Sequence, residues 1–254
     1  MPQIDTAHRR LRSAAFLLSL ALLAALAAYA ATGGDIVLDH RIADAVYPLR
    51  SDAGVAVMGW ITRIGGRHGV LPLLAGATVA LLLLRRSDLL AAVWVAALGN
   101  LVSVTLLKAA FDRPRPAMGY FIETSGSFPS GHAAGAIAVW AMLWIVSARL
   151  HLIRRGPAIA AAVLCAVVIG GTRIYLGQHY LTDILGGYLL GGLWLTAGLT
   201  CAAHMTPRPT APRHRMAATS MAAAIALAVI LASTLTRPVA EPEPTGNGQS
   251  AAGV

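Results

Sequence analysis

Long apolar runs, repeated along most of the chain, constrain its fold more than any other feature. Of the 254 residues, 57% are hydrophobic and only 12% are charged. A helix of about 20 apolar residues matches the hydrocarbon thickness of a bilayer. Only helices and closed barrels satisfy all their backbone hydrogen bonds in lipid, and runs of this length favour helices. The sequence therefore predicts an all-α fold, a polytopic membrane helix bundle.

Seven apolar runs are separated by short polar or basic segments. The expected spans are residues 13–32, 69–84, 89–107, 131–147, 157–171, 180–203 and 216–236. The chain then divides into an N-terminal cytoplasmic segment with the first span, an outer loop with an amphipathic helix, a six-helix core, a basic linker with an extra C-terminal span, and a disordered tail. These parts are residues 1–32, 33–68, 69–203, 204–236 and 237–254.

Two segments allow a second interpretation. The first run ends in Ala28-Tyr29-Ala30, which also fits the small-residue cleavage site of a signal peptide. We expect no cleavage, because the run is long and further spans follow it. Between residues 33 and 68, the spacing of Val55 and Ile61 suits an interfacial amphipathic helix, but an ordinary solvated loop with one short helix fits equally well.

Basic residues give the orientation. The formal net charge is +9, but the basic residues form small clusters between apolar runs rather than one nucleic-acid-binding patch. With the N-terminus inside, eleven of the twenty basic residues fall on inner segments. The apolar runs predict a multi-pass membrane protein. Because the chain is small and rich in alanine and arginine, we expect its membrane to be a bacterial inner membrane. The polar segments described next then open on the outer side.

The most unusual polar segment lies between the fifth and sixth expected spans. It carries Arg173, His179 and Asp183, and Asp183 is the only acidic residue between Glu123 and Glu241. Ionisable groups at the mouth of a membrane segment are costly and usually functional. His179 and Asp183 are four residues apart, so they would share one face of a helix that begins here.

A second polar segment follows the third span. Lys108 is the only lysine, against nineteen arginines, and it stands at the membrane boundary. It could be a snorkelling anchor, but an arginine would serve that purpose, so we favour a functional role. Pro114 and Pro116 stiffen the loop that carries Arg115.

The third polar segment, Pro129-Ser130-Gly131-His132, immediately precedes the fourth span. Ser130 occupies the position of a helix N-cap, and amide groups at a helix start bind anions readily. His132 faces the same space from the first turn. A plain helix cap would explain the serine equally well.

Together these segments supply cations, helix-start amides, two histidines and one carboxylate. Cations with several N–H donors suit a phosphate group. A histidine oriented by a carboxylate suits a nucleophile, and a second histidine suits a general acid. The sequence contains no recognisable metal-ligand pattern, and we expect no metal and no cofactor.

The spacing resembles the signature of the type 2 phosphatidic acid phosphatase superfamily. Its three motifs are Lys-x6-Arg-Pro, Pro-Ser-Gly-His and Ser-Arg-x5-His-x3-Asp. They correspond here to Lys108 to Pro116, Pro129 to His132 and Thr172 to Asp183, with Thr172 in place of the usual serine. The resemblance covers roughly residues 55–203.

The resemblance implies a metal-independent lipid phosphatase with a six-helix core. It implies that His179 attacks phosphorus to form a phosphohistidine, that Asp183 orients His179, and that His132 protonates the departing oxygen. It also implies a phosphate site, made of Lys108, Arg115, Ser130, Gly131 and Arg173. Arg113 lies outside the signature, and we expect it to support the site or to contact a lipid head group.

The implied substrate is a lipid phosphate that reaches the site from the bilayer. Polyprenyl diphosphate, phosphatidylglycerophosphate and phosphatidic acid all fit. A phosphotransferase that uses the same site and a non-catalytic lipid transporter are the alternatives. No nucleic-acid partner is expected, and the sequence favours no particular oligomeric state.

Overall fold

The chain forms a helix bundle, as expected. A computed structural model describes residues 2–31 and 37–206, and these residues contain helices but no β-strand. The elements are α1 (Pro2–Ala31), α2 (Val37–Val46), η1 (Tyr47–Leu49), α3 (Asp52–Gly65), α4 (Arg67–Leu83), α5 (Ser87–Phe111), α6 (Gly131–Gly135), η2 (Ala136–Ala141), α7 (Met142–Arg149), α8 (Arg155–Tyr175) and α9 (Leu181–Ala203). Five described stretches are long and apolar enough to cross a membrane. The expected span at 216–236 and the tail lie outside the described residues.

Four of the expected spans correspond to α5, to the continuous stretch from α6 to α7, to α8 and to α9. Two of these helices extend further toward the polar segments than the sequence indicated. Because α5 continues to Phe111 and α8 to Tyr175, Lys108 and Arg173 lie in the last helical turns rather than in loops. Helical geometry therefore fixes the direction of both side chains.

The N-terminal half differs from the expectation. Residues 33–68 were expected to form an outer loop with one amphipathic helix, but they contain both α2 and α3. Helix α3 continues into α4 after a break at Gly66, so that residues Asp52–Leu83 form one apolar stretch of span length. The expected span at 69–84 is thus the second half of a longer one. The apolar part of α1, Phe16–Ala31, is shorter than the other spans.

Local sequence explains where the helices near the polar end begin and end. The Ser130 hydroxyl accepts a hydrogen bond from the Ala133 amide (3.5 Å) and caps α6, as expected. Asp112 ends α5 in the left-handed conformation (φ 37°), and a proline two residues later prevents the helix from continuing. At the start of α9, the Asp183 carboxylate accepts from the Tyr180 amide (2.9 Å).

Helix α9 lies against α1, α5 and α6 and holds the bundle together. Small residues permit this approach. A β-carbon at Gly187 would come within 2.6 Å of the Ser130 carbonyl oxygen, and one at Gly191 would collide with the Ala134 carbonyl. In lipid, helices associate through such close packing, because apolar surface gains little by leaving a hydrocarbon solvent.

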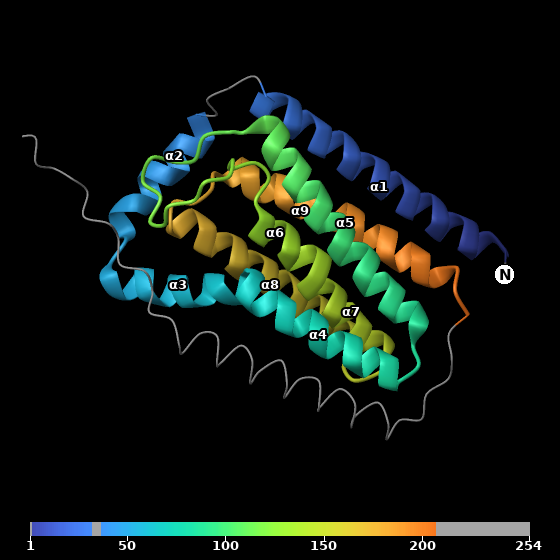
Figure 1. Ribbon diagram of the computed structural model, residues 1–254. Helices are drawn as coiled ribbons and strands as arrows, with labels where there is room; N and C mark the ends of the chain where they lie inside the picture. Colours follow the sequence, from blue (N-terminus) through green and yellow to red (C-terminus); the bar gives the residue numbers. More distant parts are fainter. Residues whose placement is uncertain (1, 32–36, 207–254) are drawn as a thin grey trace, which may run out of the picture.

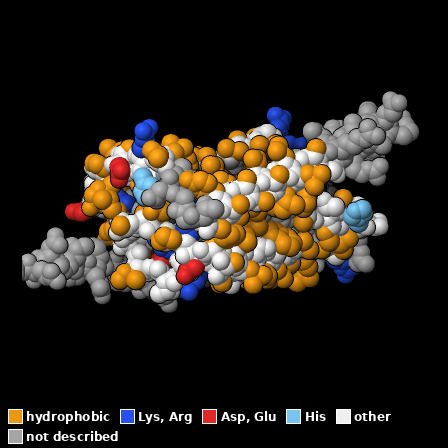
Figure 2. All heavy atoms as spheres, turned by 90° about the horizontal axis from the view of Figure 1, so that it is seen from above, with side chains coloured by type: hydrophobic (Ala, Val, Ile, Leu, Met, Phe, Trp, Pro, Cys, Tyr) orange, Lys and Arg blue, Asp and Glu red, His pale blue; other side chains and the backbone are white. Residues whose placement is uncertain are grey.

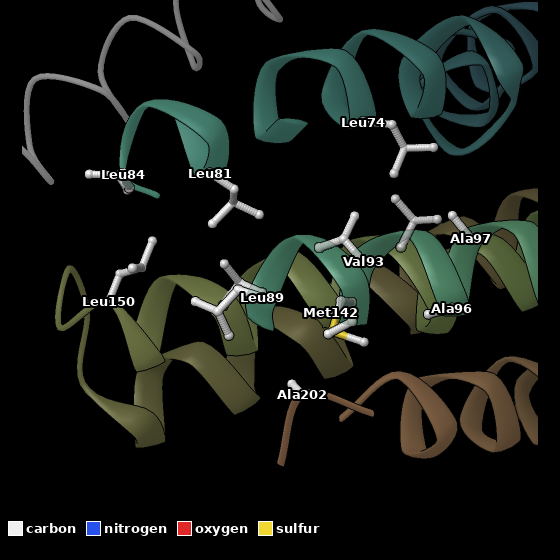
Figure 3. Packing of buried hydrophobic residues seen from close by; sticks show 13 residues of the cluster. Leu74, Leu81, Leu84, Leu89, Val93, Ala96, Ala97, Met142, Leu150 and Ala202 are labelled. Atoms are coloured by element: carbon white, nitrogen blue, oxygen red, sulfur yellow. The ribbon is translucent and has the colours of Figure 1, made fainter. Parts of the chain in front are cut away.

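A cluster of apolar side chains fills the end of the bundle away from the polar segments (Figure 3). Leu81 of α4, Leu89 of α5 and Met142 of α7 are almost completely buried in it. A gap in this cluster would lose dispersion contacts even inside a membrane. This packed end gives the bundle a rigid base.

The surface follows the same division. Figure 2 shows hydrophobic side chains over the middle of the visible face and charged side chains mainly toward the two ends of the long axis. This pattern suits a protein whose middle faces lipid. In Figure 1, α2, the ends of α5 and α8, and the beginnings of α6 and α9 gather at one end of the bundle, which we call the polar end.

Candidate active site

The structure brings together at the polar end the residues that the sequence singled out. They are Lys108 at the end of α5, Arg115 in the following loop, Ser130, Gly131 and His132 at the start of α6, Arg173 at the end of α8, His179 on the connecting turn, and Asp183 in the first turn of α9. Segments that are up to about 75 positions apart in sequence thus share one site.

His179 and Asp183 are adjacent, but they do not share a helical face. Helix α9 begins at Leu181, so His179 lies on the turn before it and Asp183 within its first turn. His179 Nδ1 is 3.4 Å from Asp183 Oδ2, and both side chains are buried. This separation is longer than an aligned hydrogen bond, and such contacts commonly tighten when substrate binds.

The other ring nitrogen of His179 faces the cations. Its Nε2 is 3.4 Å from Arg115 Nη1. Burial lowers the pKa of His179 well below its ordinary value, and the positive charges of Arg173, Lys108 and Arg115 lower it further. The imidazole is therefore neutral at neutral pH, which is the form required of a nucleophile.

Arg113 binds the carboxylate oxygen of Asp183 that does not face His179. Its Nη1 donates to Asp183 Oδ1 (2.6 Å), its Nη2 donates to Asp39 Oδ2 (3.0 Å), and its guanidinium lies 4.6 Å from the centre of the Tyr180 ring. Burial alone lowers the pKa of Arg113, but the carboxylates of Asp183 and Asp39 outweigh this effect and raise it above the ordinary value. The arginine that lies outside the signature thus pairs directly with the residue expected to orient His179.

Asp39 is a member of the site that the sequence did not indicate. It comes from α2 and is only 1% exposed. Besides Arg113, it accepts hydrogen bonds from the amide (3.0 Å) and the hydroxyl (2.5 Å) of Thr182. Arg113 Nη1 also donates to this hydroxyl (2.8 Å). A carboxylate this deeply buried needs such partners, and here they tie α2 to the start of α9.

Two arginines face the opposite side of His179. Arg115 donates to the backbone carbonyls of Ser125 and Gln178 (both 2.9 Å), which fixes its guanidinium in the loop. Arg173 is 2% exposed, and its Nη1 donates to the Thr62 hydroxyl of α3 (2.9 Å). Backbone and hydroxyl groups hold both cations without neutralising them.

The carboxylate of Glu123 bridges these two arginines. Its Oε1 is 2.9 Å from Arg173 Nη2, and its Oε2 is 3.3 Å from Arg115 Nη2. The Glu123 side chain is 34% exposed. Arginine forks bind carboxylate and phosphate oxygens in similar ways. The Glu123 carboxylate therefore marks a position where an oxyanion fits between the two arginines.

Ser130, His132 and Lys108 complete the site. The Ser130 amide donates to the Asp183 carbonyl (2.9 Å), which joins the start of α6 to the start of α9. His132 Nε2 lies against Gly66, where a β-carbon would come within 2.8 Å of it. The Lys108 ammonium donates to the Gly126 carbonyl, in the loop that carries Glu123. In the part of the chain that the structure describes, no three His, Cys, Asp or Glu side chains converge as a metal site.

Three partners of the expected residues carried little or no sequence signal. Asp39 stood among many mixed charges, Thr62 was one hydroxyl in an apolar stretch, and Glu123 was an isolated loop acid. Each belongs to an element whose position follows only from tertiary packing. A buried arginine requires partners, so Arg113 and Arg173 were the only clue that such residues exist.

Sequence comparisons identify relatives. The profile of the PAP2 superfamily matches residues 88–207. Phosphatidylglycerophosphatase B of Bacillus subtilis (strain 168) is 30% identical over 158 residues, which are 60% of this chain and 77% of the relative. Lipid A 1-phosphatase of Rhizobium etli is 34% identical over 98 residues, which are 34% of this chain and 39% of that protein.

Solved structures agree with these relatives. The crystal structure of a transmembrane PAP2-type phosphatidylglycerolphosphate phosphatase from Bacillus subtilis has a TM-score of 0.65 at 26% identity, covering 77% of this chain and 97% of that one. Aquifex aeolicus LpxE has a TM-score of 0.54 at 26% identity, covering 65% and 97%.

Fold and relatives together define a multi-pass membrane protein of the lipid phosphatase class. More particularly, the chain belongs to the PAP2 superfamily, and its similarity is to the membrane PAP2 phosphatases. The matched segment begins at residue 88, so α2 and α3, which supply Asp39 and Thr62, lie outside it.

Proposed function

We propose that the protein is a metal-independent phosphatase that hydrolyses lipid phosphomonoesters or diphosphates through a phosphohistidine intermediate. One observation carries this proposal: Arg115 and Arg173 hold an oxyanion, the Glu123 carboxylate, and Arg115 also lies beside His179 Nε2. A phosphoryl group in place of this carboxylate would meet two arginines and a neutral imidazole nitrogen. Lys108 and the amides at Ser130 and Gly131 would bind its remaining oxygens.

In the first step, His179 Nε2 attacks phosphorus and the bond from phosphorus to the lipid oxygen breaks. His132 donates a proton to that oxygen as it leaves. Asp183 accepts from His179 Nδ1–H, which fixes the tautomer and stabilises the positive charge that develops on the ring. Arg113 keeps Asp183 in place.

In the second step, water attacks the phosphohistidine. His132, now neutral, accepts a proton from this water as the phosphorus–nitrogen bond breaks and inorganic phosphate forms. The negative charge of the transferring group requires compensation throughout. The fixed cations Lys108, Arg115 and Arg173 supply it, which is the role that metal ions have in other phosphatases.

The substrate we propose is a lipid that reaches the polar end from the bilayer. The apolar middle of the bundle and the position of the site at its end support this. We propose that the polar end opens on the outer side of a bacterial inner membrane, which the distribution of arginine supports. Polyprenyl diphosphate, phosphatidylglycerophosphate and phosphatidic acid are the substrates to compare.

The test is phosphate release by the full chain, purified in detergent, over a panel of these three lipids. We expect release from at least one lipid without added divalent metal and in the presence of a chelator. His179→Ala should abolish it, while His204→Ala, an exposed histidine at the far end of α9, should not. Release from none of the lipids would contradict the proposal. Transfer of phosphate to an added alcohol instead of water would identify a phosphotransferase.

A further inference from the structure

A pocket of about 170 Å³ is lined in part by His179, and Glu123 is not among its lining residues. Its walls come from α2, from residues 116–118 of the loop, and from the turn between α8 and α9. His179 and Arg50 both line it. The reaction described above uses His179 but leaves both the pocket and Arg50 without a role.

Arg50 is held firmly in this wall. Its Nε donates to the Tyr175 carbonyl and its Nη1 to the Met118 carbonyl, both at 2.7 Å. These carbonyls belong to the end of α8 and to the loop, so they fix the guanidinium but do not neutralise its charge. The remaining nitrogen, Nη2, makes no hydrogen bond to any described residue. Burial lowers the pKa of Arg50, but the group stays charged at neutral pH.

Gly177 makes room for this guanidinium. A β-carbon at Gly177 would collide with Arg50 Nη2, and the residue has a φ of 65°, which favours glycine. Gly177 lies two residues before His179 on the same turn. The turn that presents His179 is therefore shaped around the Arg50 guanidinium.

The charges in the pocket favour an anion near Arg50. Asp39 also lines it, but Arg113 pairs with its carboxylate. Asp44 lines it as well, but Asp44 is exposed, so water screens its charge. Arg50 is half-buried and has an unused donor. Near His179, Arg113, Arg115 and Arg173 each pair with a carboxylate. Arg50 has no carboxylate partner among the described residues.

We propose that Arg50 binds a second phosphate group of the substrate, one that is not hydrolysed while the first lies against His179. This inference rests on the proposed function and narrows it to lipids with two phosphates. The second phosphate can be adjacent to the first, as in a lipid diphosphate, or separated from it by a glycerol, as in phosphatidylglycerophosphate. Phosphatidic acid, with one phosphate, would leave Arg50 unused.

The experiment compares kcat/KM for the three lipids between the wild type and Arg50→Gln. We expect Arg50→Gln to lower kcat/KM for a two-phosphate lipid about tenfold more than for phosphatidic acid, as expected for loss of a charged hydrogen bond. Arg50→Lys, which keeps the charge, should lose less than Arg50→Gln. Arg41→Gln, an exposed arginine on α2, is the matched control and should change none of the rates.

The phosphatidic acid rate, measured on the same preparation, separates binding from folding. The fixed hydrogen bonds of Arg50 support the turn for every substrate, so a purely structural role would lower all three rates by the same factor, and that result would overturn the proposal. An unchanged Arg50→Gln enzyme would also overturn it. A selective loss for the diphosphate alone, or for phosphatidylglycerophosphate alone, supports it and gives the spacing of the two phosphates. If the wild type releases phosphate from no lipid, the proposed function itself fails.

Discussion

Two clusters of arginine and carboxylate lie on opposite sides of His179, and they differ in exposure. Behind the histidine, Arg113 pairs with Asp183 and Asp39, and none of the three side chains is more than 9% exposed. In front of it, Arg115 and Arg173 pair with Glu123, which is 34% exposed. The carboxylates are thus buried behind His179, whereas the carboxylate in front of it is partly open to solvent.

The difference in exposure suggests a difference in role. Removing one partner from a buried ion cluster leaves an uncompensated charge, so the rear cluster must stay intact and can hold Asp183 rigidly. An exposed carboxylate recovers its hydration when it leaves, so Glu123 can give way to another anion at little cost. The rear cluster therefore acts as a scaffold, and the front cluster is where phosphate and carboxylate exchange.

The largest effect is expected from Arg113→Met. This change leaves Asp183 and Asp39 buried without their cation, and we expect it to lower the free energy of unfolding by about 3–5 kcal/mol. Arg115→Met is the matched control, because Glu123 can then turn to water. We expect this control to abolish most of the activity but to cost only about 1–2 kcal/mol of stability.

Thermal unfolding in detergent and phosphate release, measured on both variants, test these expected differences in stability and activity. If Arg113→Met and Arg115→Met lower the melting temperature equally, the rear cluster is not a special scaffold and the comparison fails.

A smaller effect is expected from Asp39→Asn. The amide oxygen can still accept from the Thr182 amide, but the negative charge facing Arg113 is lost. We expect kcat to fall about tenfold, with KM changed less than about twofold, because Asp39 acts through Arg113 and Asp183 rather than on the substrate. Steady-state kinetics test this split, with Asp52→Asn, an exposed carboxylate at the start of α3, as the control. A rise in KM with unchanged kcat would place Asp39 in substrate binding instead.

The smallest effect is expected from Glu123→Gln. Without its charge, residue 123 competes less well with the incoming phosphate, so KM should fall about two- to fivefold while kcat and stability change little. Inorganic phosphate should also inhibit this variant at lower concentration. An increase in KM would mean that Glu123 helps to bind the substrate and is not displaced by it.

The site was predictable where its chemistry is local in sequence. Lys108 and Arg115, or His179 and Asp183, are close along the chain and next to apolar runs, so spacing alone placed them near one another. Asp39 and Thr62 reach their partners across 143 and 111 positions, and Glu123 reaches Arg173 across 50. Those contacts depend on how whole helices pack, which hydrophobic periodicity does not specify.

The fold shows the same limit. Length and hydropathy placed α5, α8 and α9 within a few residues, because the bilayer demands long apolar helices. They did not indicate that α3 continues into α4, since Gly66 and the charged pair that follows resemble the end of a loop. The position of α2 over the start of α9 was equally hidden, because it depends on the buried pairing of Asp39.

The central claim, that His179 becomes phosphorylated during turnover, can be tested by rapid quenching. The full-length enzyme is mixed with its best lipid substrate, labelled in the scissile phosphate, and stopped in alkali, in which phosphohistidine survives. The account predicts label on His179 that is absent from His179→Ala and that forms more slowly in His132→Ala, which lacks the group that protonates the leaving oxygen. Label on another residue, or turnover without any labelled protein, would contradict it.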